Sequence, residues 1–147
     1  MKKSIVYWSP CLTKVGTMKS TLNSSISLAK YSKNCEVIIL NVFGEWTKFE
    51  GYLKKNDVIL KNLTFDYYDL LPKKGFLKSR LSYIIIFLIS AIPLFLFIKK
   101  TKPDYFIIHL ITSLPLLLLN FFKIKTKVIL RISGYPKLNF LRKKLWL

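Results

Sequence analysis

The apolar residues of this chain gather in short, nearly continuous runs that are rich in β-branched side chains. Such runs, bounded by polar loops, predict strands that are buried on both faces of a parallel sheet. Five are expected, over Ser4–Ser9, Glu36–Phe43, Asp57–Lys61, Tyr105–His109 and from Lys127 onward. Because these runs alternate with helices or long connections, the pattern favours an α/β fold with helices on both faces of the sheet.

Two segments between the runs have the spacing of helices. Apolar or small residues recur every three or four positions over Met18–Tyr31, and a run of leucines covers most of Leu114–Phe122. The second segment follows Thr112 and Ser113, whose hydroxyl groups suit a helix N-cap. The other expected elements are loops over Lys54–Asn56 and Pro72–Gly75 and a helix that begins at Lys137.

Two apolar stretches support a second interpretation, a membrane hairpin. Leu81–Ile98 and Tyr105–Phe122 each run for about eighteen residues without a formal charge, near the lower limit for crossing ~30 Å of hydrocarbon. Against the hairpin, basic residues flank the first stretch at both ends, and the second divides naturally into a strand and a helix. Residues that lipid disfavours also lie inside the stretches: Pro93, His109, Pro115 and Asn120.

We therefore favour, for Leu81–Ile98, a helix that packs against the sheet or lies on a bilayer with its basic ends at the headgroups. The alternative is a small integral membrane protein with two transmembrane helices and no catalytic role. The first interpretation predicts a cytoplasmic protein that is peripheral at the inner face of the cell membrane.

Length and charge narrow the class of protein further. A chain of 147 residues has room for one domain with a real core, and 52% of its residues are hydrophobic. Its net charge of +18 favours anionic partners such as nucleic acid, acidic lipid headgroups or sugar phosphates. Nucleic acid is the least favoured, because arginine is scarce and most aromatic residues lie in apolar runs instead of a basic groove.

The cysteines and the N-terminus bear on the compartment. Cys11 and Cys35 are far apart and have no Cys or His beside them at metal-ligand spacing, so neither a zinc site nor a disulfide framework is expected. The apolar segment Ile5–Trp8 is too short for the core of a signal peptide. Both observations fit a reduced, cytoplasmic setting.

Three motifs occur in an order that is informative. They are a first strand followed by Gly16–Thr17 and a helix, the strand Lys102–His109, and the segment Arg131–Gly134 after the next strand. In this order the chain resembles the N-terminal half of the GT-B glycosyltransferases, specifically the family-four retaining enzymes that build bacterial cell-surface polysaccharides. The resemblance implies that residues 1–147 form one Rossmann-like acceptor domain, which faces a donor-binding domain across a cleft.

The chemistry implied by the resemblance is transfer of a sugar from a nucleotide-sugar donor to a lipid-linked or saccharide acceptor. No cofactor is implied, since the nucleotide sugar is a substrate. The family's donor-binding domain carries two glutamates separated by seven residues, and no such pair occurs in this chain. We therefore expect the polypeptide to be inactive alone and to need a donor domain, supplied by a further part of the same protein or by a separate chain.

The resemblance also assigns positions near the ligand. Gly16 matches a glycine in the first loop, where a missing Cβ allows close backbone approach, and Thr17 stands where the family often has a second glycine. His109 matches the first histidine of a frequent His-x-His corner, with Ile111 in the second position. For each residue a structural role, an ordinary turn at Gly16 and a strand-end hydrogen bond at His109, remains open.

Further candidates follow the fourth and fifth strands. Thr112 and Ser113 would hold substrate hydroxyls or cap the next helix. Arg131 would neutralise a phosphate or pair with a carboxylate, and Gly134 would line the cleft or form a turn.

On the acceptor side, Glu45 and Trp46 follow the second strand, where an acidic group or an aromatic ring could meet a sugar. The sequence has no hydrolase-like carboxylate pair, Ser-His-Asp set, Walker loop or metal cluster.

Overall fold

The computed structural model describes residues 2–13, 16–32, 34–73, 75–109, 111 and 113–132. Three predictions fall outside these residues: the roles of Thr112 and Gly134 and the helix from Lys137.

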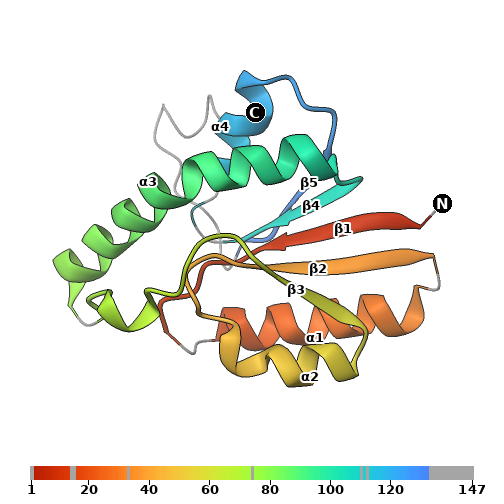
Figure 1. Ribbon diagram of the computed structural model, residues 1–147, viewed down its shortest axis with the longest axis horizontal. Coiled ribbons are helices and arrows are strands. Elements are labelled where there is room, and N and C mark those ends of the chain that lie inside the picture. Colours follow the sequence, from red (N-terminus) through yellow and green to blue (C-terminus); the bar gives the residue numbers. More distant parts are fainter. Residues whose placement is uncertain are drawn as a thin grey trace.

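A parallel sheet forms the centre of the molecule (Figure 1). It has five strands in the order β3-β2-β1-β4-β5, and each neighbouring pair is parallel. The sheet confirms the predicted fold class, a Rossmann-like α/β domain, and each strand begins within two residues of its predicted position. The strands are β1 (Lys3–Trp8), β2 (Cys35–Asn41), β3 (Val58–Asn62), β4 (Tyr105–Ile108) and β5 (Lys127–Leu130).

Helices cover both faces of the sheet. Figure 1 shows α1 and α2 on one face and α3 and α4 on the other. Among the described residues the helices are α1 (Gly16–Tyr31), α2 (Glu50–Lys55), α3 (Phe76–Thr101) and α4 (Ser113–Phe121), and short 3-10 helices span Thr47–Phe49 and Tyr68–Leu70. The predicted loop over Lys54–Asn56 is wrong at its first two residues. Buried Leu53 anchors α2, and Lys54 and Lys55 continue it as good helix formers.

Side chains of the strands alternate between two apolar cores. Val6, Trp8 and Phe106 join the core beneath α3 and α4, while Tyr7 and Ile107 join the core beneath α1 and α2. Both faces of the central strands are therefore buried, which explains why their sequences are continuous apolar runs with no polar alternation.

The first residues of the segment 102–109 end α3 and start β4. Lys102 adopts a left-handed conformation with φ of 44°, and its N–H closes α3 on the carbonyl of Ile98. Pro103 cannot continue the helix. A carboxylate oxygen of Asp104 then accepts a hydrogen bond from the N–H of Ser4 at 2.8 Å, which fixes the start of β4 beside β1.

Residues 105–122 therefore do not form one helix, because β4 and α4 divide the segment. The division agrees with the predicted strand and helix. Of the two spans that a membrane hairpin would need, only the first is one long helix in the described part of the chain. That helix, α3, is longer than the predicted 81–98 and includes Pro93.

The backbone at Gly44, just after β2, packs closely against Asp66. Its φ is +98°, and a Cβ there would lie 2.0 Å from a carboxylate oxygen of Asp66, whose side chain bonds Thr47 and the N–H of Tyr68. We expect Gly44→Ala to lower the free energy of unfolding by about 1–3 kcal/mol, because the backbone is strained and Asp66 must leave its partners. Urea denaturation would measure the change.

The matched control is Gly51→Ala in α2, where an added Cβ meets no atom within 4 Å. Alanine favours the helix, so this substitution should raise stability by about 0.5–1 kcal/mol. Equal effects of the two substitutions would contradict the role of Gly44.

Candidate functional site

The carboxyl ends of β1 and β4 lie side by side at the point where the strand order reverses. From β1 the chain moves to β2 and β3 on one side, and it then returns through α3 to β4 on the other side. In open α/β sheets ligands bind outside the carboxyl ends of the strands at such a reversal. The candidate site is therefore at this edge, next to Ser9 and His109.

A row of three polar residues extends the sheet at this edge. The N–H of His109 donates to the carbonyl of Trp8 at 2.9 Å, and the N–H of Arg131 donates to that of Ile108 at 2.9 Å. Because alternate strand residues share a face, Ser9, His109 and Arg131 follow Tyr7 and Ile107 on the face that α1 covers. The sheet thus ends, under the first turns of α1, in polar side chains.

Arg131 spans from the edge of the sheet to α1. Its Nη1 donates to the carbonyl of Ser20 at 3.3 Å and to the hydroxyl of Ser24 at 2.8 Å, and its Nη2 donates to the hydroxyl of Ser20. In the part of the chain that the structure describes, the one ion pair is between Lys73 and Asp69, so Arg131 pairs with no carboxylate there. Its charge is held in place by neutral groups and is available to an anion at the edge.

His109 is buried without a partner for one ring nitrogen. The residue is 4% exposed, and its Nε2 has no hydrogen-bond partner among the described residues. Burial first, and then the charge of Arg131, lower the pKa of His109 from 6.5 to about 4. The imidazole is therefore neutral near pH 7, and Nε2 is a buried polar atom at this edge that no described residue satisfies.

At the end of β1, by contrast, the polar groups satisfy one another. The hydroxyl of Ser9 accepts a hydrogen bond from Thr21 at 3.2 Å and lies 3.5 Å from the sulfur of Cys11. The indole N–H of Trp46 donates to the carbonyl of Ser9 at 3.3 Å. Burial raises the pKa of the Cys11 thiol to about 11, so this group stays protonated and structural.

The predicted loop and corner residues begin helices at the same edge. Gly16 is exposed at the start of α1, where a Cβ would meet no atom within 4 Å, and Thr17 follows it half-buried. Ser113 begins α4, also half-buried. Both helix N-termini follow strands at the carboxyl edge, and their free N–H groups favour an anion there. The structure thus places Gly16, Thr17 and Ser113 at the edge that also carries His109 and Arg131.

Glu45 and Trp46 are built into the end of β2. The Glu45 carboxylate is buried and accepts hydrogen bonds from the N–H groups of Val42 at 3.1 Å and Phe43 at 2.8 Å. Burial raises the pKa of Glu45 to about 8 despite these bonds. The side chain of Trp46 is fully buried, and the backbone N–H of Trp46 donates to the side-chain oxygen of Asn41. In this structure neither residue presents a surface to a sugar.

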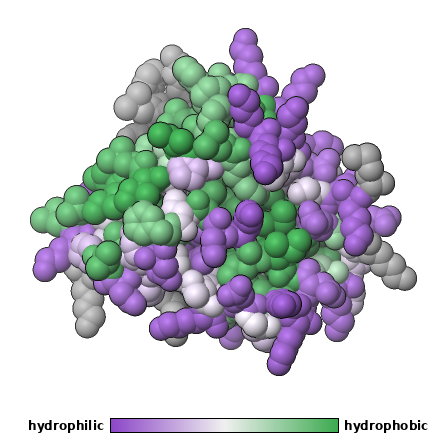
Figure 2. Space-filling model, in the orientation of Figure 1, coloured by the Kyte–Doolittle hydropathy of each residue, from purple (hydrophilic) through white to green (hydrophobic). Residues whose placement is uncertain are grey.

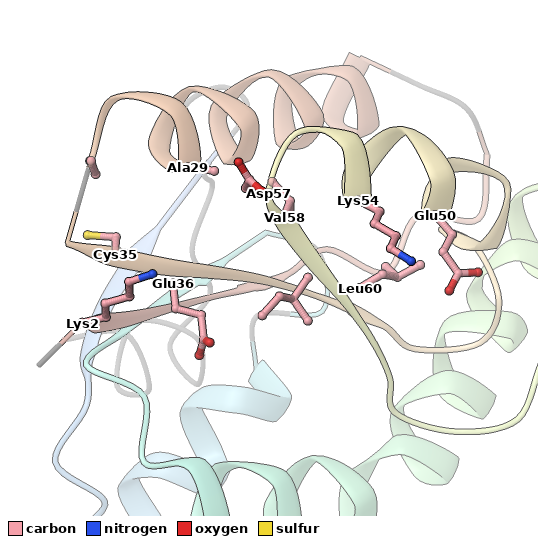
Figure 3. Close-up of a pocket in the computed structure, with 11 residues that line it drawn as sticks. Lys2, Ala29, Cys35, Glu36, Glu50, Lys54, Asp57, Val58 and Leu60 are labelled. Atoms are coloured by element: carbon pink, nitrogen blue, oxygen red, sulfur yellow. The ribbon is translucent and has the colours of Figure 1, made fainter.

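A hollow of about 700 Å³ lies at the opposite, amino edge of the sheet (Figure 3). Charged side chains from the starts of β1 and β2 and from α2 line it, among them Lys2, Glu36, Glu50 and Lys54. The sequence motifs gave no sign of this hollow. None of the buried atoms left without a partner among the described residues belongs to its lining.

No family model, curated protein or solved structure matches this chain. Among the described residues no group of three or more His, Cys, Asp or Glu side chains could hold a metal ion. The candidate site therefore depends on its geometry alone, the polar row under α1 and the two helix N-termini beside it.

The lowered pKa of His109 predicts a pH dependence of stability. An unfolded histidine with a pKa near 6.5 takes up its proton before the folded one does at about 4. The contribution of His109 to the free energy of unfolding should therefore fall as the pH decreases from about 6.5 to about 4, by up to about 3 kcal/mol. Glu45, with its raised pKa, acts in the opposite direction over much of this range. Chemical denaturation at several pH values would measure this slope.

His109→Gln, which cannot titrate, should lose that slope. The contribution of Glu45 is common to both proteins and cancels in the difference between their curves. If the two curves were parallel from pH 4 to 6.5, the burial of His109 as a neutral group would be contradicted.

Proposed function

We propose that this chain is the acceptor-binding half of a glycosyltransferase that moves a sugar from a nucleotide-sugar donor to a lipid-linked or saccharide acceptor. The observation that carries the proposal is Nε2 of His109, which is buried beside Arg131 at the strand-order reversal and has no hydrogen-bond partner among the described residues. The order of motifs along the sequence supports the sugar as the transferred group. A Rossmann-like fold supports many different reactions, so the fold by itself does not favour sugar transfer over the others.

The residues at this edge suit the demands of sugar transfer. Departure of a nucleoside diphosphate leaves negative charge, which the guanidinium of Arg131 and the N-terminus of α1 would offset. A neutral imidazole has one nitrogen that accepts a hydrogen bond, so Nε2 of His109 would orient an acceptor hydroxyl when the other ring nitrogen carries the proton. In this proposal the residues position the substrates and offset developing charge. Groups held on helices and strands perform both tasks better than groups on loops.

Binding at this edge can be followed through the single histidine of the chain. We expect a short-chain isoprenyl diphosphate sugar, used as an acceptor, to shift the imidazole NMR signals of His109 and the amide signals of Gly16 and Thr17. UDP- and GDP-sugars should bind poorly, because their binding also needs the donor domain. A bound diphosphate should also raise the pKa of His109, because a nearby negative charge favours the imidazolium.

Arg131→Gln should weaken this binding by roughly tenfold, since a charged hydrogen-bond donor is lost. Lys48→Gln, which removes an exposed charge near α2, is the control and should bind as the unaltered chain does. Unchanged amide signals of the core strands β1 and β2 in the free Arg131→Gln protein would show that its fold is intact. The proposal fails if the isoprenyl diphosphate sugar leaves His109 and Gly16 unshifted, or if the shifts fall only at Lys54 and Glu36 in the hollow at the amino edge.

The 147-residue chain should not transfer sugar by itself, because it lacks the paired glutamates of the family's donor domain. Incubation with radiolabelled nucleotide sugars and membrane lipid extracts would test this, and addition of a family-four donor domain as a separate chain should be required for any product. Transfer at a normal enzymatic rate by the isolated chain would contradict a half-site.

A further inference from the structure

The outer face of α3 carries exposed apolar side chains along most of its length. They recur at intervals of three or four residues, and each is more than half exposed. We call this set the outer stripe: Leu77, Leu81, Ile84, Leu88, Ile92 and Leu96. Figure 2 shows that hydrophobic surface follows α3 and continues over α4, whereas much of the remaining surface in this view is hydrophilic.

The inner face of the same helix is the part that holds the sheet. Ile86, Leu94 and Ile98 are fully buried in the core, and two buried serines lie between and before them. Ser82 donates to the carbonyl of Pro72 at 2.7 Å, and Ser90 donates to the carbonyl of Ile86 within the helix. The sheet covers the inner apolar face of α3, but the outer apolar face is exposed to water. An exposed apolar face of this length indicates that a second apolar partner covers it.

Aromatic rings extend the outer stripe onto the neighbouring helix. Phe95 of α3 contacts Phe122, just after α4, with ring centroids 4.0 Å apart, and Phe121 contacts Phe122 at 5.0 Å. The side chain of Phe121 is 81% exposed. Together with the outer stripe, these rings form one continuous apolar surface on α3 and α4, which belong to the same helix layer. Isolated exposed apolar residues are common on proteins, but a continuous surface of this kind marks an interaction site.

Charge at the margins of this surface indicates what covers it. Lys99 and Lys100 end α3, Lys123 and Lys125 follow α4, and all four are exposed. From Leu70 to the last residue, the only acidic side chain in the sequence is Asp104, which the N–H of Ser4 already engages. A protein partner would usually meet a mixed-charge rim, whereas acidic lipid headgroups match a rim that is basic throughout.

The fold decides how the helix lies relative to a bilayer. By length and composition α3 is the one described helix that could cross a membrane. However, α3 connects β3 at one edge of the sheet to β4 beside β1, and its inner face is packed on that sheet. A spanning α3 would have to leave the core, so a bilayer can reach only the outer stripe, with the helix parallel to the surface.

We infer that the outer stripe of α3, with Phe121 and Phe122, is a docking surface for an anionic lipid bilayer. The apolar side chains enter the boundary between headgroups and acyl chains, and the lysines at the ends of α3 and α4 contact acidic headgroups. This inference does not depend on sugar transfer. If the proposed function also holds, docking brings the carboxyl edge of the sheet to the surface where lipid-linked acceptors reside.

Vesicle binding of the 147-residue chain tests the inference directly. In co-sedimentation with vesicles of phosphatidylcholine and 30% phosphatidylglycerol, the chain should bind, and Leu88→Ser with Ile92→Ser should weaken binding at least tenfold. Tyr31→Ser with Tyr52→Ser, which removes exposed apolar groups from the opposite helix layer, is the matched control and should leave binding unchanged.

The contribution of charge is tested by a second pair of variants. Lys99→Gln with Lys100→Gln should lower binding to the anionic vesicles about tenfold and have little effect with pure phosphatidylcholine. Lys48→Gln with Lys55→Gln lowers the net charge equally on the other layer and should bind as the unaltered chain does.

Three results would overturn the inference. The first is equal loss of binding in the lysine variants and their controls, which would indicate a general charge effect, or in the stripe variants and their controls, which would show that binding is not specific to the outer stripe. The second is a dimer in solution that the Leu88 and Ile92 substitutions dissociate, which would assign the surface to a second copy of the chain. The third is resistance of the membrane-bound protein to carbonate extraction, which would show that α3 spans the bilayer. All of these readouts omit sugar substrates, so the proposed function can fail while the inference stands.

Discussion

The pairing of β4 with β1 is the constraint on which the rest of the structure depends. It places β1 at the centre of the sheet, with a parallel neighbour on each side, and it obliges α3 to return across the sheet before β4 can begin. The hydrogen bond from Ser4 to Asp104 fixes the register of the two strands at their start. The same register sets His109 beside Ser9 at their end, so the core and the candidate site depend on one alignment.

The sequence determines this alignment to a useful degree. A β-branched run opened by Pro103 and Asp104 cannot continue the preceding helix, and its length suits a buried strand. The strand and the leucine-rich helix after it could therefore be separated, although hydropathy alone would join them. The boundaries of α3 were less predictable, since its ends are set by Gly75 and by the left-handed Lys102, and neither changes the hydrophobic pattern.

The candidate site was harder to predict because its contacts join residues that are distant in sequence. The motifs suggested His109 and Arg131, but the bonds from Arg131 to Ser20 and Ser24 cross more than 100 residues and depend on the finished fold. Glu45 shows the opposite case. An acidic residue after a strand resembles a ligand-binding group, yet its carboxylate turns inward to the N–H groups of Val42 and Phe43, an arrangement that only local backbone geometry reveals.

The carboxyl and amino edges of the sheet differ in how firmly their charged side chains are held, and composition alone does not reveal this difference. At the carboxyl edge, charged and polar groups are few and are held by the fold, as Arg131 is by α1. At the amino edge, charged side chains such as Lys54 and Glu36 surround an open hollow. Preorganised groups have little freedom to lose when a ligand binds, which favours the carboxyl edge over the open hollow as the site.

The last strand in the described sheet has one further consequence. Only β4 pairs with β5 there, and Val128 and Ile129 are at least a third exposed. A bare row of backbone N–H and C=O groups flanked by β-branched side chains is a template for strand addition. Lys127 is the one charged side chain within β5 that discourages it. The free side of β5 in the described sheet is therefore a surface on which a second copy of the domain could add a strand in concentrated solution, and pairing of β5 with β5 would give a closed dimer.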